Sequence, residues 1–234
     1  LQPGRSVLDV GCGPGTITLD IAARVAPGRV VGLDRSEDVV AAAAADAAAS
    51  GVTDVVFTTG DVYALDEPDD AFDVVHAHQV LQHLTDPVAA LREMRRVCAP
   101  GGVVAVRDSD YATFTWWPED PRLTRWLELY HAVARGNDAE PDAGRRLLAW
   151  AHAAGFTEVD ASASTWCFAT PEDRAWWGGL WADRIVASAF ADQAIDGGFA
   201  TRPELEEISA AWREWSDAPD AWFAIVHGEL RARA

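Results

Sequence analysis

The chain has 234 residues, enough for one α/β domain with a lid and too few for two ordinary domains with separate cores. Hydrophobic residues make up 49% and charged residues 24%, a composition that supports a buried core and excludes general disorder. All 19 basic residues are arginine, because the sequence contains no lysine. Enzymes that need a Schiff-base lysine, a phosphate-loop lysine or a Tyr–Lys reductase pair are therefore excluded.

Charge and cysteine content restrict the partners and the compartment. The formal net charge is −18, which disfavours nucleic acid because such binding depends on arginine and lysine at phosphates. The three cysteines, Cys12, Cys98 and Cys167, are odd in number and far apart, which suits a reducing compartment. No stretch approaches the roughly 20 apolar residues of a membrane span. We expect a cytoplasmic protein without nucleic-acid or membrane partners, and, since Met94 is the only methionine, further sequence upstream of Leu1.

Strand and helix signals alternate in the first half of the chain. Short β-branched runs predict strands at 7–10, 29–33, 55–58, 72–76 and 103–107. Amphipathic or alanine-rich stretches predict helices at 17–25, 36–49 and 86–98. This alternation predicts a parallel sheet with helices on both faces.

The second half has a different composition. All eleven tryptophans lie between Trp116 and Trp222. Helices are predicted at 121–135, 142–154, 171–194 and 203–215, and strands at 158–168 and 222–227. No repeat or low-complexity linker separates these pieces. We therefore expect a single domain over 1–234, with a cofactor-binding core at 1–109 and helical cap insertions at 110–141 and 169–219.

A glycine motif and two acids mark a nucleotide-type site. Residues 7–15, Val-Leu-Asp-Val-Gly-Cys-Gly-Pro-Gly, form a strand that ends in alternating glycines and opens a helix. Glycine permits close approach of a ligand to the backbone, and the helix N-terminus offers N–H groups. Asp34 ends the second predicted strand and Asp61 follows the third. An acid in the position of Asp34 suits acceptance of hydrogen bonds from ribose hydroxyls.

With these motifs the sequence resembles the class I S-adenosylmethionine-dependent methyltransferases, in particular the small-molecule group that includes ubiquinone and menaquinone biosynthesis enzymes. The resemblance covers residues 3 to about 109 and rests on the segments 7–15, 32–34, 60–62, 72–75 and 98–102. It implies a Rossmann-like, doubly wound α/β sheet of seven strands, the last antiparallel, with helical cap insertions. It also implies S-adenosylmethionine as cofactor, S-adenosylhomocysteine as product and a small-molecule methyl acceptor. Ala99 replaces a lysine usual in the family, a change we expect to be harmless.

The resemblance assigns one group of residues to the methionine end of the cofactor. Gly11 and Gly13 would pack against the methionine part. Asp9 would orient the glycine loop near the sulfonium. His78 and Gln79, which follow the fourth predicted strand, would line the methionine tail and face the methyl group.

A second group belongs to the nucleoside. By the same resemblance Asp34 would hold the ribose, and Asp61 would hold the adenine amino group beside the backbone of Val62. The full expected cofactor set is Asp9, Gly11, Cys12, Gly13, Gly15, Asp34, Arg35, Asp61, Val62, His78 and Gln79.

Methyl transfer from a sulfonium is an in-line displacement, so the enzyme mainly aligns donor and acceptor and a general base is optional. His78 is the candidate base; the alternative is that it packs against the cofactor and transfers no proton. His83 is expected to begin a helix and to be structural. His76 and His78 share one strand face, but only Asp108 and Asp110 follow the fifth strand. We expect no catalytic metal.

The acceptor pocket is expected in the cap insertions, since the shared core binds only the cofactor. Trp177, Trp181 and Arg184 recur at helical spacing and share a face. Tryptophan walls suit a flat aromatic or polycyclic acceptor. The candidate substrate residues are Tyr111, Trp116, Trp177, Trp181 and Arg184. The alternative is that the tryptophans are ordinary core, and that Arg184 pairs with a surface carboxylate rather than an acidic substrate.

Two other functions remain open. The domain could bind S-adenosylmethionine without transferring a methyl group. An NAD(P)-dependent oxidoreductase is less favoured, because its fingerprint requires glycine at the position of Thr16. The arginine-only, alanine-rich composition suggests a GC-rich bacterial genome, and the resemblance then suggests a role in secondary metabolism.

Overall fold

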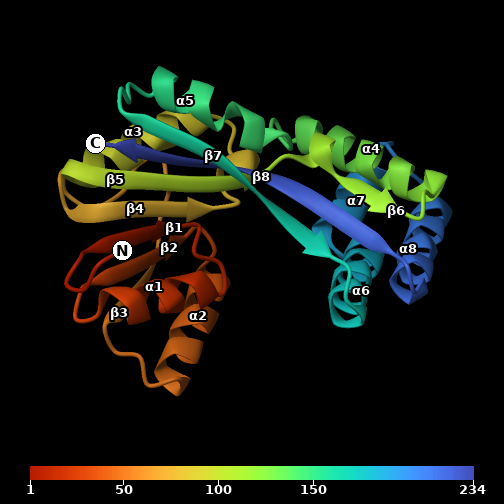
Figure 1. Cartoon of the computed structure of the whole chain (residues 1–234), viewed down its shortest axis with the longest axis horizontal. Coiled ribbons are helices and arrows are strands. Elements are labelled where there is room, and N and C mark those ends of the chain that lie inside the picture. The colour runs from red at the N-terminus through yellow and green to blue at the C-terminus, as the bar shows by residue number, and fades with distance from the viewer. The chain divides into compact units, whose positions relative to one another are not determined.

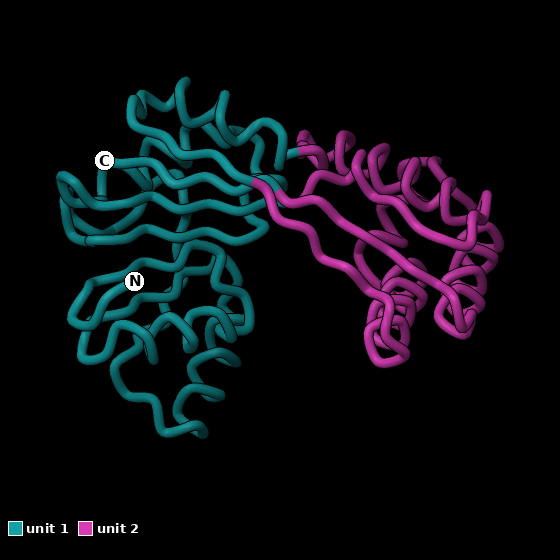
Figure 2. The backbone as a smooth tube through the Cα atoms, in the orientation of Figure 1, with its two compact units in different colours: residues 1–108, 143–162, 228–234 teal, residues 109–142, 163–227 magenta.

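The computed structural model describes all 234 residues and forms two compact units (Figure 2). Unit 1 contains residues 1–108, 143–162 and 228–234, and unit 2 contains residues 109–142 and 163–227. The segments expected as cap insertions, 110–141 and 169–219, fall inside the ranges of unit 2. The chain therefore passes between the units after residues 108, 142, 162 and 227.

A mainly parallel sheet forms the centre of unit 1 (Figure 1), with the strand order β3-β2-β1-β4-β5-β8. Its strands are β1 (Val7–Val10), β2 (Val30–Asp34), β3 (Val55–Thr59), β4 (Phe72–His78), β5 (Cys98–Ser109), the second half of β8 (Trp222–Arg233) and the start of β7 (Val159–Phe168), which pairs with β8. The first five pair in parallel. The N–H of Gly101 donates to the carbonyl of Ala234, and the N–H of Ala234 donates to Gly102, both at 3.2 Å. The end of β8 thus lies beside the start of β5, which confirms the doubly wound sheet with an antiparallel last strand.

Alternation along the strands places helices on both faces of this sheet, because successive strand side chains point to opposite sides. Val7 packs with Ile21 on one face, whereas its neighbour Leu8 joins a larger core with Leu91 and Met94 on the other. The helices of unit 1 are α1 (Thr16–Val25), α2 (Glu37–Ala49), η1 (Leu81–His83), α3 (Pro87–Val97), η3 (Ala143–Arg146) and α5 (Leu147–Ala153).

Several element boundaries in unit 1 differ from the sequence prediction. Strand β4 continues to His78, so this histidine ends the strand instead of following it. Strand β5 begins at Cys98 rather than 103, with a register shift against β4 between Phe72 and Val74. His83 closes the single turn η1 instead of beginning a helix. The predicted helix 142–154 is a 3-10 segment, η3, followed by the short helix α5.

Unit 2 is built around an aromatic core. Its elements are η2 (Tyr111–Thr113), β6 (Thr115–Trp117), α4 (Pro121–Gly136), α6 (Pro171–Ala187), α7 (Ala189–Asp196), α8 (Arg202–Asp217), the end of β7 (Val159–Phe168) and the first half of β8. The Trp126 ring meets the rings of Trp181 and Trp212 at centroid distances of 4.6 and 4.8 Å, near perpendicular. Such edge-to-face pairs stabilise a core beyond simple burial. No helix in the structure combines the length and the apolar character that crossing a membrane demands.

Three features of this half were not predicted. The helix expected over 171–194 is two helices, because Ser188 leaves the helical conformation and its hydroxyl accepts the N–H of Phe190 as the cap of α7. Strand β6, antiparallel to β8, is only three residues long. Strand β8 continues to Arg233 and does not end at 227.

Helices α6 and α8 pack closely in unit 2, and Gly178 lies at their contact. A Cβ atom at Gly178 would lie 2.8 Å from Cβ of Ser216 and 2.9 Å from the carbonyl oxygen of Trp212. At the adjacent Gly179 a Cβ atom would meet nothing within 4 Å. The helix pair therefore needs glycine at one of the two positions only.

We predict that Gly178→Ala lowers the thermal stability of the protein, because the added methyl group forces the helices apart. Gly179→Ala is the matched control and should raise stability by about 0.5–1 kcal/mol, the helix preference of alanine over glycine. Thermal unfolding followed by tryptophan fluorescence measures both. Equal effects of the two substitutions would contradict the close packing at Gly178.

Candidate functional site

The segments expected to hold a cofactor meet at one edge of the unit 1 sheet. Strand pairing aligns Val10 with Leu33 and with Ala77, and Asp34 with Thr59. The glycine loop after β1 and the residues after β2, β3 and β4 therefore follow neighbouring carboxyl ends. In open parallel sheets this edge is where ligands bind.

The glycine loop has a backbone that only glycine adopts without strain. Gly11, Gly13 and Gly15 have φ angles of 65°, 53° and 81°, the left-handed region. A Cβ atom at Gly11 would collide with Val80, whereas at Gly13 it would meet nothing within 4 Å. Gly15 caps α1 without a side-chain hydrogen bond, so the first N–H groups of this helix are left for a ligand or water. Gly13 is thus the glycine whose open side suits a ligand.

Asp34 is fixed beside this loop. Its Oδ2 accepts the N–H of Gly13 and its Oδ1 accepts the N–H of Ser36, both at 3.1 Å. A carboxylate has about four acceptor positions, so two contacts leave room for ligand hydroxyls. The N–H of Gly60 donates to the Asp34 carbonyl at 3.0 Å, which brings the end of β3 next to it. The adjacent Arg35 is exposed.

Asp61 and Val62 follow β3 and take different environments. Oδ1 of Asp61 accepts the N–H of Tyr63 at 2.9 Å, and the Asp61 side chain is exposed. Val62 is buried in the larger core of unit 1. The carboxyl group of Asp61 therefore stands at the accessible edge of the sheet while Val62 anchors the segment.

Asp9 lies beneath the loop, in a buried cluster that sequence analysis did not find. The residue is only 2% exposed. Its Oδ2 accepts the hydroxyl of Thr18 at 2.6 Å, and its Oδ1 is 2.7 Å from Nδ1 of His76. The sequence had placed His76 only among possible metal ligands. Asp9 and His76 are register partners, so the pairing of β1 with β4 is the signal that would have found this contact.

Burial controls the two reactive side chains nearest the loop. Burial, followed by the charges of Asp9 and Asp34, raises the pKa of the Cys12 thiol to about 12, so Cys12 is not a nucleophile at neutral pH. Burial, followed by the charges of Arg107 and His76, lowers the pKa of His78 to about 4. His78 is therefore neutral near pH 7, and so low a pKa is poorly matched to accept a proton there.

The turn after β4 carries Gln79 in the left-handed region, at φ 56°. Its N–H donates to the carbonyl of Arg107 at 2.7 Å, and its side-chain Oε1 accepts from Nε2 of Gln82 at 3.4 Å. The backbone N–H of Gln82 in turn donates to Oδ1 of Asp108 at 3.1 Å. Gln82 belongs to no recognisable sequence motif, so sequence analysis assigns it no role.

Asp108 is fully buried at the end of β5. Burial raises its pKa to about 7, against the lowering effect of the N–H groups of Gln82 and Leu81. Sequence analysis treats Asp108 only as a possible metal ligand. No group of three or more His, Cys, Asp or Glu side chains in the structure is arranged to hold a metal ion.

The residues expected to bind the acceptor lie in unit 2, and three of the five are inside its core. Tyr111, Trp177 and Trp181 are 5%, 7% and 1% exposed. Trp116 is partly buried and stacks on Phe223. The burial favours the alternative in which these rings fill the core instead of lining a wall. Arg184 is exposed, with its guanidinium 5.2 Å from the centre of the Trp181 ring.

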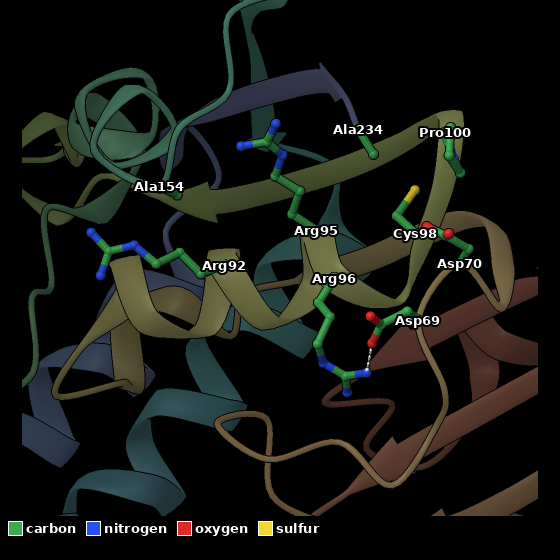
Figure 3. Close-up of a pocket in the computed structure, with 9 residues that line it drawn as sticks. All are labelled: Asp69, Asp70, Arg92, Arg95, Arg96, Cys98, Pro100, Ala154 and Ala234. Carbon is green, nitrogen blue, oxygen red and sulfur yellow. Dashed lines mark hydrogen bonds and ion pairs between the residues drawn. The ribbon is translucent and has the colours of Figure 1, made fainter.

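A cavity of about 440 Å³ opens elsewhere in unit 1 (Figure 3). Asp69 and Asp70 before β4, Cys98 and Pro100 at the start of β5, and arginines of α3 line it. This is the edge of the sheet opposite the glycine loop. Arg96 on its wall is neutralised by Asp69 and Glu93, each at 2.6 Å. None of the expected cofactor or acceptor residues lines this cavity.

Comparison with known proteins identifies the family. The family described as a methyltransferase domain matches residues 1–164. A methyltransferase of Schizosaccharomyces pombe, itself uncharacterised, is 34% identical over 96% of this chain and 82% of its own length. The chain therefore belongs to the methyltransferase domain family.

Other relatives agree with this assignment. The demethylmenaquinone methyltransferase of Geobacillus stearothermophilus is 34% identical to the domain over 58% of this chain and 54% of its own length. The crystal structure of a putative methyltransferase from Bacillus halodurans has a TM-score of 0.60 at 19% identity, covering 100% of this chain and 94% of that one. This second likeness shows the Rossmann-like fold of the methyltransferase domain.

We predict that Thr18→Val destabilises the methyltransferase domain by about 1–3 kcal/mol, the cost of leaving a buried acceptor of Asp9 without its donor. Valine keeps the shape of threonine and removes the hydroxyl. Thr16→Val, at an exposed position two residues earlier, is the control and should change stability by about 0.5 kcal/mol or less. Urea unfolding measures both; a loss shared by the control would argue against the Asp9 contact.

Proposed function

We propose that this protein transfers a methyl group from S-adenosylmethionine to a small organic acceptor by direct displacement. The observation that carries the proposal is the glycine loop, in which Gly13 is open to a ligand and Asp34 is fixed beside it. This loop lies at the carboxyl edge of the parallel sheet, and the chain belongs to the methyltransferase domain family. The arrangement offers N–H donors and a carboxylate side by side at one edge of the sheet, as a nucleoside carrying an amino acid requires.

The residues at this edge fit the proposed cofactor. Asp34 retains acceptor positions for the ribose hydroxyls, and the exposed carboxylate of Asp61 would accept the adenine amino group beside the Val62 backbone. Gly11 and Gly13 place no side chain at their positions in the loop, and Asp9 holds the loop in place from beneath through Thr18 and His76. When bound, S-adenosylmethionine supplies an electrophilic methyl group on a sulfur that leaves without protonation.

By the resemblance to class I methyltransferases, His78 and Gln79, which end β4 and begin the turn after it, would face the methyl group. Because the pKa of His78 is lowered to about 4, we propose that it orients ligands as a neutral imidazole rather than acting as the general base. Displacement of a sulfonium methyl group needs alignment more than proton transfer, so the reaction does not depend on a strong base here.

We infer an aromatic or polycyclic acceptor, in keeping with a role in secondary metabolism. The relative from Geobacillus stearothermophilus is named for demethylmenaquinone, a quinone. In unit 2, Arg184 is the exposed member of the expected acceptor set, and its stacking on Trp181 would suit an acceptor that carries negative charge. The net charge of −18 argues against nucleic-acid substrates.

Thermal unfolding with S-adenosylhomocysteine tests the cofactor, with NAD as the control ligand. A ligand at about 100 times its dissociation constant adds about 2.7 kcal/mol to the native state, which for a chain of this size shifts the midpoint by roughly 5–11 °C. We expect the shift with S-adenosylhomocysteine and none with NAD. The opposite pattern would favour the oxidoreductase, and a shift with neither would remove the proposed cofactor.

We predict that Gly13→Ala weakens S-adenosylhomocysteine binding at least about tenfold, or 1.4 kcal/mol, because its methyl group enters the space of the ligand. Gly51→Ala is the matched control: Gly51 also has a positive φ, 71°, and also has nothing within 4 Å of an added Cβ. Both variants carry the same backbone strain. Calorimetric titration should show unchanged affinity for Gly51→Ala, and equal losses would place the ligand elsewhere.

Methyl transfer itself is tested with a panel of phenols, quinols and amines. Release of S-adenosylhomocysteine in a single turnover with a matched acceptor is the expected result. Tight binding of S-adenosylmethionine with no release of S-adenosylhomocysteine for any acceptor in the panel would favour the alternative hypothesis, in which the domain binds this cofactor and transfers no methyl group.

A further inference from the structure

Two buried oxygen atoms near Gln79 lack a hydrogen-bond donor. Oδ2 of Asp108 and Oε1 of Gln82 are inaccessible to solvent and have no partner. Both residues belong to unit 1 and are 0% and 3% exposed. A buried oxygen without a donor destabilises the folded state, so two such acceptors on contacting residues call for a common explanation.

The contacts around these oxygens form a chain. Asp108 accepts the backbone N–H of Gln82 through Oδ1, which brings the two residues together. The side-chain Nε2 of Gln82 donates to Oε1 of Gln79 at 3.4 Å and is 3.3 Å from Nε2 of His83. The amide oxygen of Gln82 is thereby turned away from Gln79. A hydrogen atom on Oδ2 of Asp108 would make that oxygen a donor and would give Oε1 of Gln82 the donor that it lacks.

We propose that Asp108 is a positioning residue: as a neutral acid it donates its Oδ2–H to Oε1 of Gln82, and this bond directs Nε2 of Gln82 to Gln79. The acid does not touch substrate, since it is fully buried. It acts through Gln82 on the side chain of Gln79, which begins the turn after β4.

The charged and titratable neighbours are consistent with a neutral acid at this place. Arg107, on the same strand, is held by Glu229 of β8 at 3.1 Å, so part of its charge is compensated. His78 of β4 is the register partner of Arg107. His83 lies in η1, and η3, which packs on η1, carries Arg145 and Arg146. Against these groups burial prevails and raises the pKa of Asp108 to about 7.

The protonation state then sets the direction of the Gln82 amide. Below pH 7 the acid form of Asp108 donates to Oε1 of Gln82, and Gln79 is held. As the pH rises above 7 the carboxylate becomes an acceptor only, so the Gln82 amide rotates to donate Nε2–H to Asp108 and releases Gln79. The consequence for the cofactor rests on the proposed function, in which Gln79 lines the methionine tail.

Side-chain amide NMR tests the coupling without any ligand. In the wild-type protein the signals of Gln82 and Gln79 should shift together between pH 6 and 9, with a midpoint near the pKa of Asp108, about 7. In Asp108→Asn both signals should stay at their low-pH positions, because asparagine keeps the acceptor for the Gln82 N–H and donates permanently to Oε1. Asp66→Asn, which removes an equal charge from an exposed loop, should titrate like the wild type.

Two outcomes overturn the proposal. One is a Gln79 signal that does not move between pH 6 and 9 in the wild type, and the other is a signal that moves equally in Asp108→Asn. If Asp108→Asn does not fold, ¹³C NMR of the Asp108 carboxyl group in the wild type decides instead. A carboxyl group that stays ionised at pH 6 contradicts the neutral acid.

Affinity for S-adenosylhomocysteine provides the second readout. We expect the wild-type affinity to weaken by roughly fivefold from pH 6 to pH 9, as a modest coupling between sites gives, and Asp108→Asn to show no such change. An NMR titration as expected with no binding of S-adenosylhomocysteine at any pH would leave the Asp108 coupling intact and reject the proposed cofactor instead. Affinity that falls equally in both proteins would contradict the role of Asp108 in positioning Gln79.

Discussion

The buried carboxylate of Asp9 is the contact on which the candidate site depends. It lies on the central strand β1, where a charge is tolerated only if its oxygens find donors. The hydroxyl of Thr18 in α1 donates to Oδ2 of Asp9, and Nδ1 of His76 in β4 is hydrogen-bonded to Oδ1. The three elements are therefore joined directly below the point where the glycine loop leaves the sheet. Asp34 holds the loop from beside it by accepting the N–H of Gly13, and the side of Gly13 on which a Cβ atom would lie stays open.

Most of the unit 1 fold follows from hydrophobic periodicity and turn chemistry. The first four strands and the helices between them carry patterns long enough to be recognised locally. Sequence patterns do not predict the secondary structure correctly where contacts with distant parts of the chain determine the backbone conformation. Strand β6 has three residues and exists through its pairing with β8, and the break at Ser188 lies within an alanine-rich stretch that local helix preference cannot exclude. The alternation of buried Leu230 and Ala232 in β8 was present in the sequence but was obscured by charged residues between them.

The site was predictable where it depends on local spacing. The glycines after β1 and the acid at the end of β2 are recognised by their order along the chain, and the parallel sheet brings them to one edge. The partners of Asp9 and the contact of Asp108 with Gln82 depend on strand register and on burial, which a single sequence does not display. The tryptophans show the same limit. Their number indicated an aromatic region, but only packing distinguishes a core ring such as Trp181 from a wall of a binding site.

The connectivity of unit 1 has a consequence for synthesis on the ribosome. Leu230 and Ala232 complete the same core as Leu8 near the start of the chain, and β8, to which they belong, pairs with β5. Between residues 109 and 234 the ribosome adds 125 residues, which at typical elongation rates takes roughly 6–25 s. During that interval the edge of β5 lacks its β8 partner, and an unpaired strand edge invites association with other chains. The edge of β5 is thus exposed to such association until β8 has been synthesised and has paired with it.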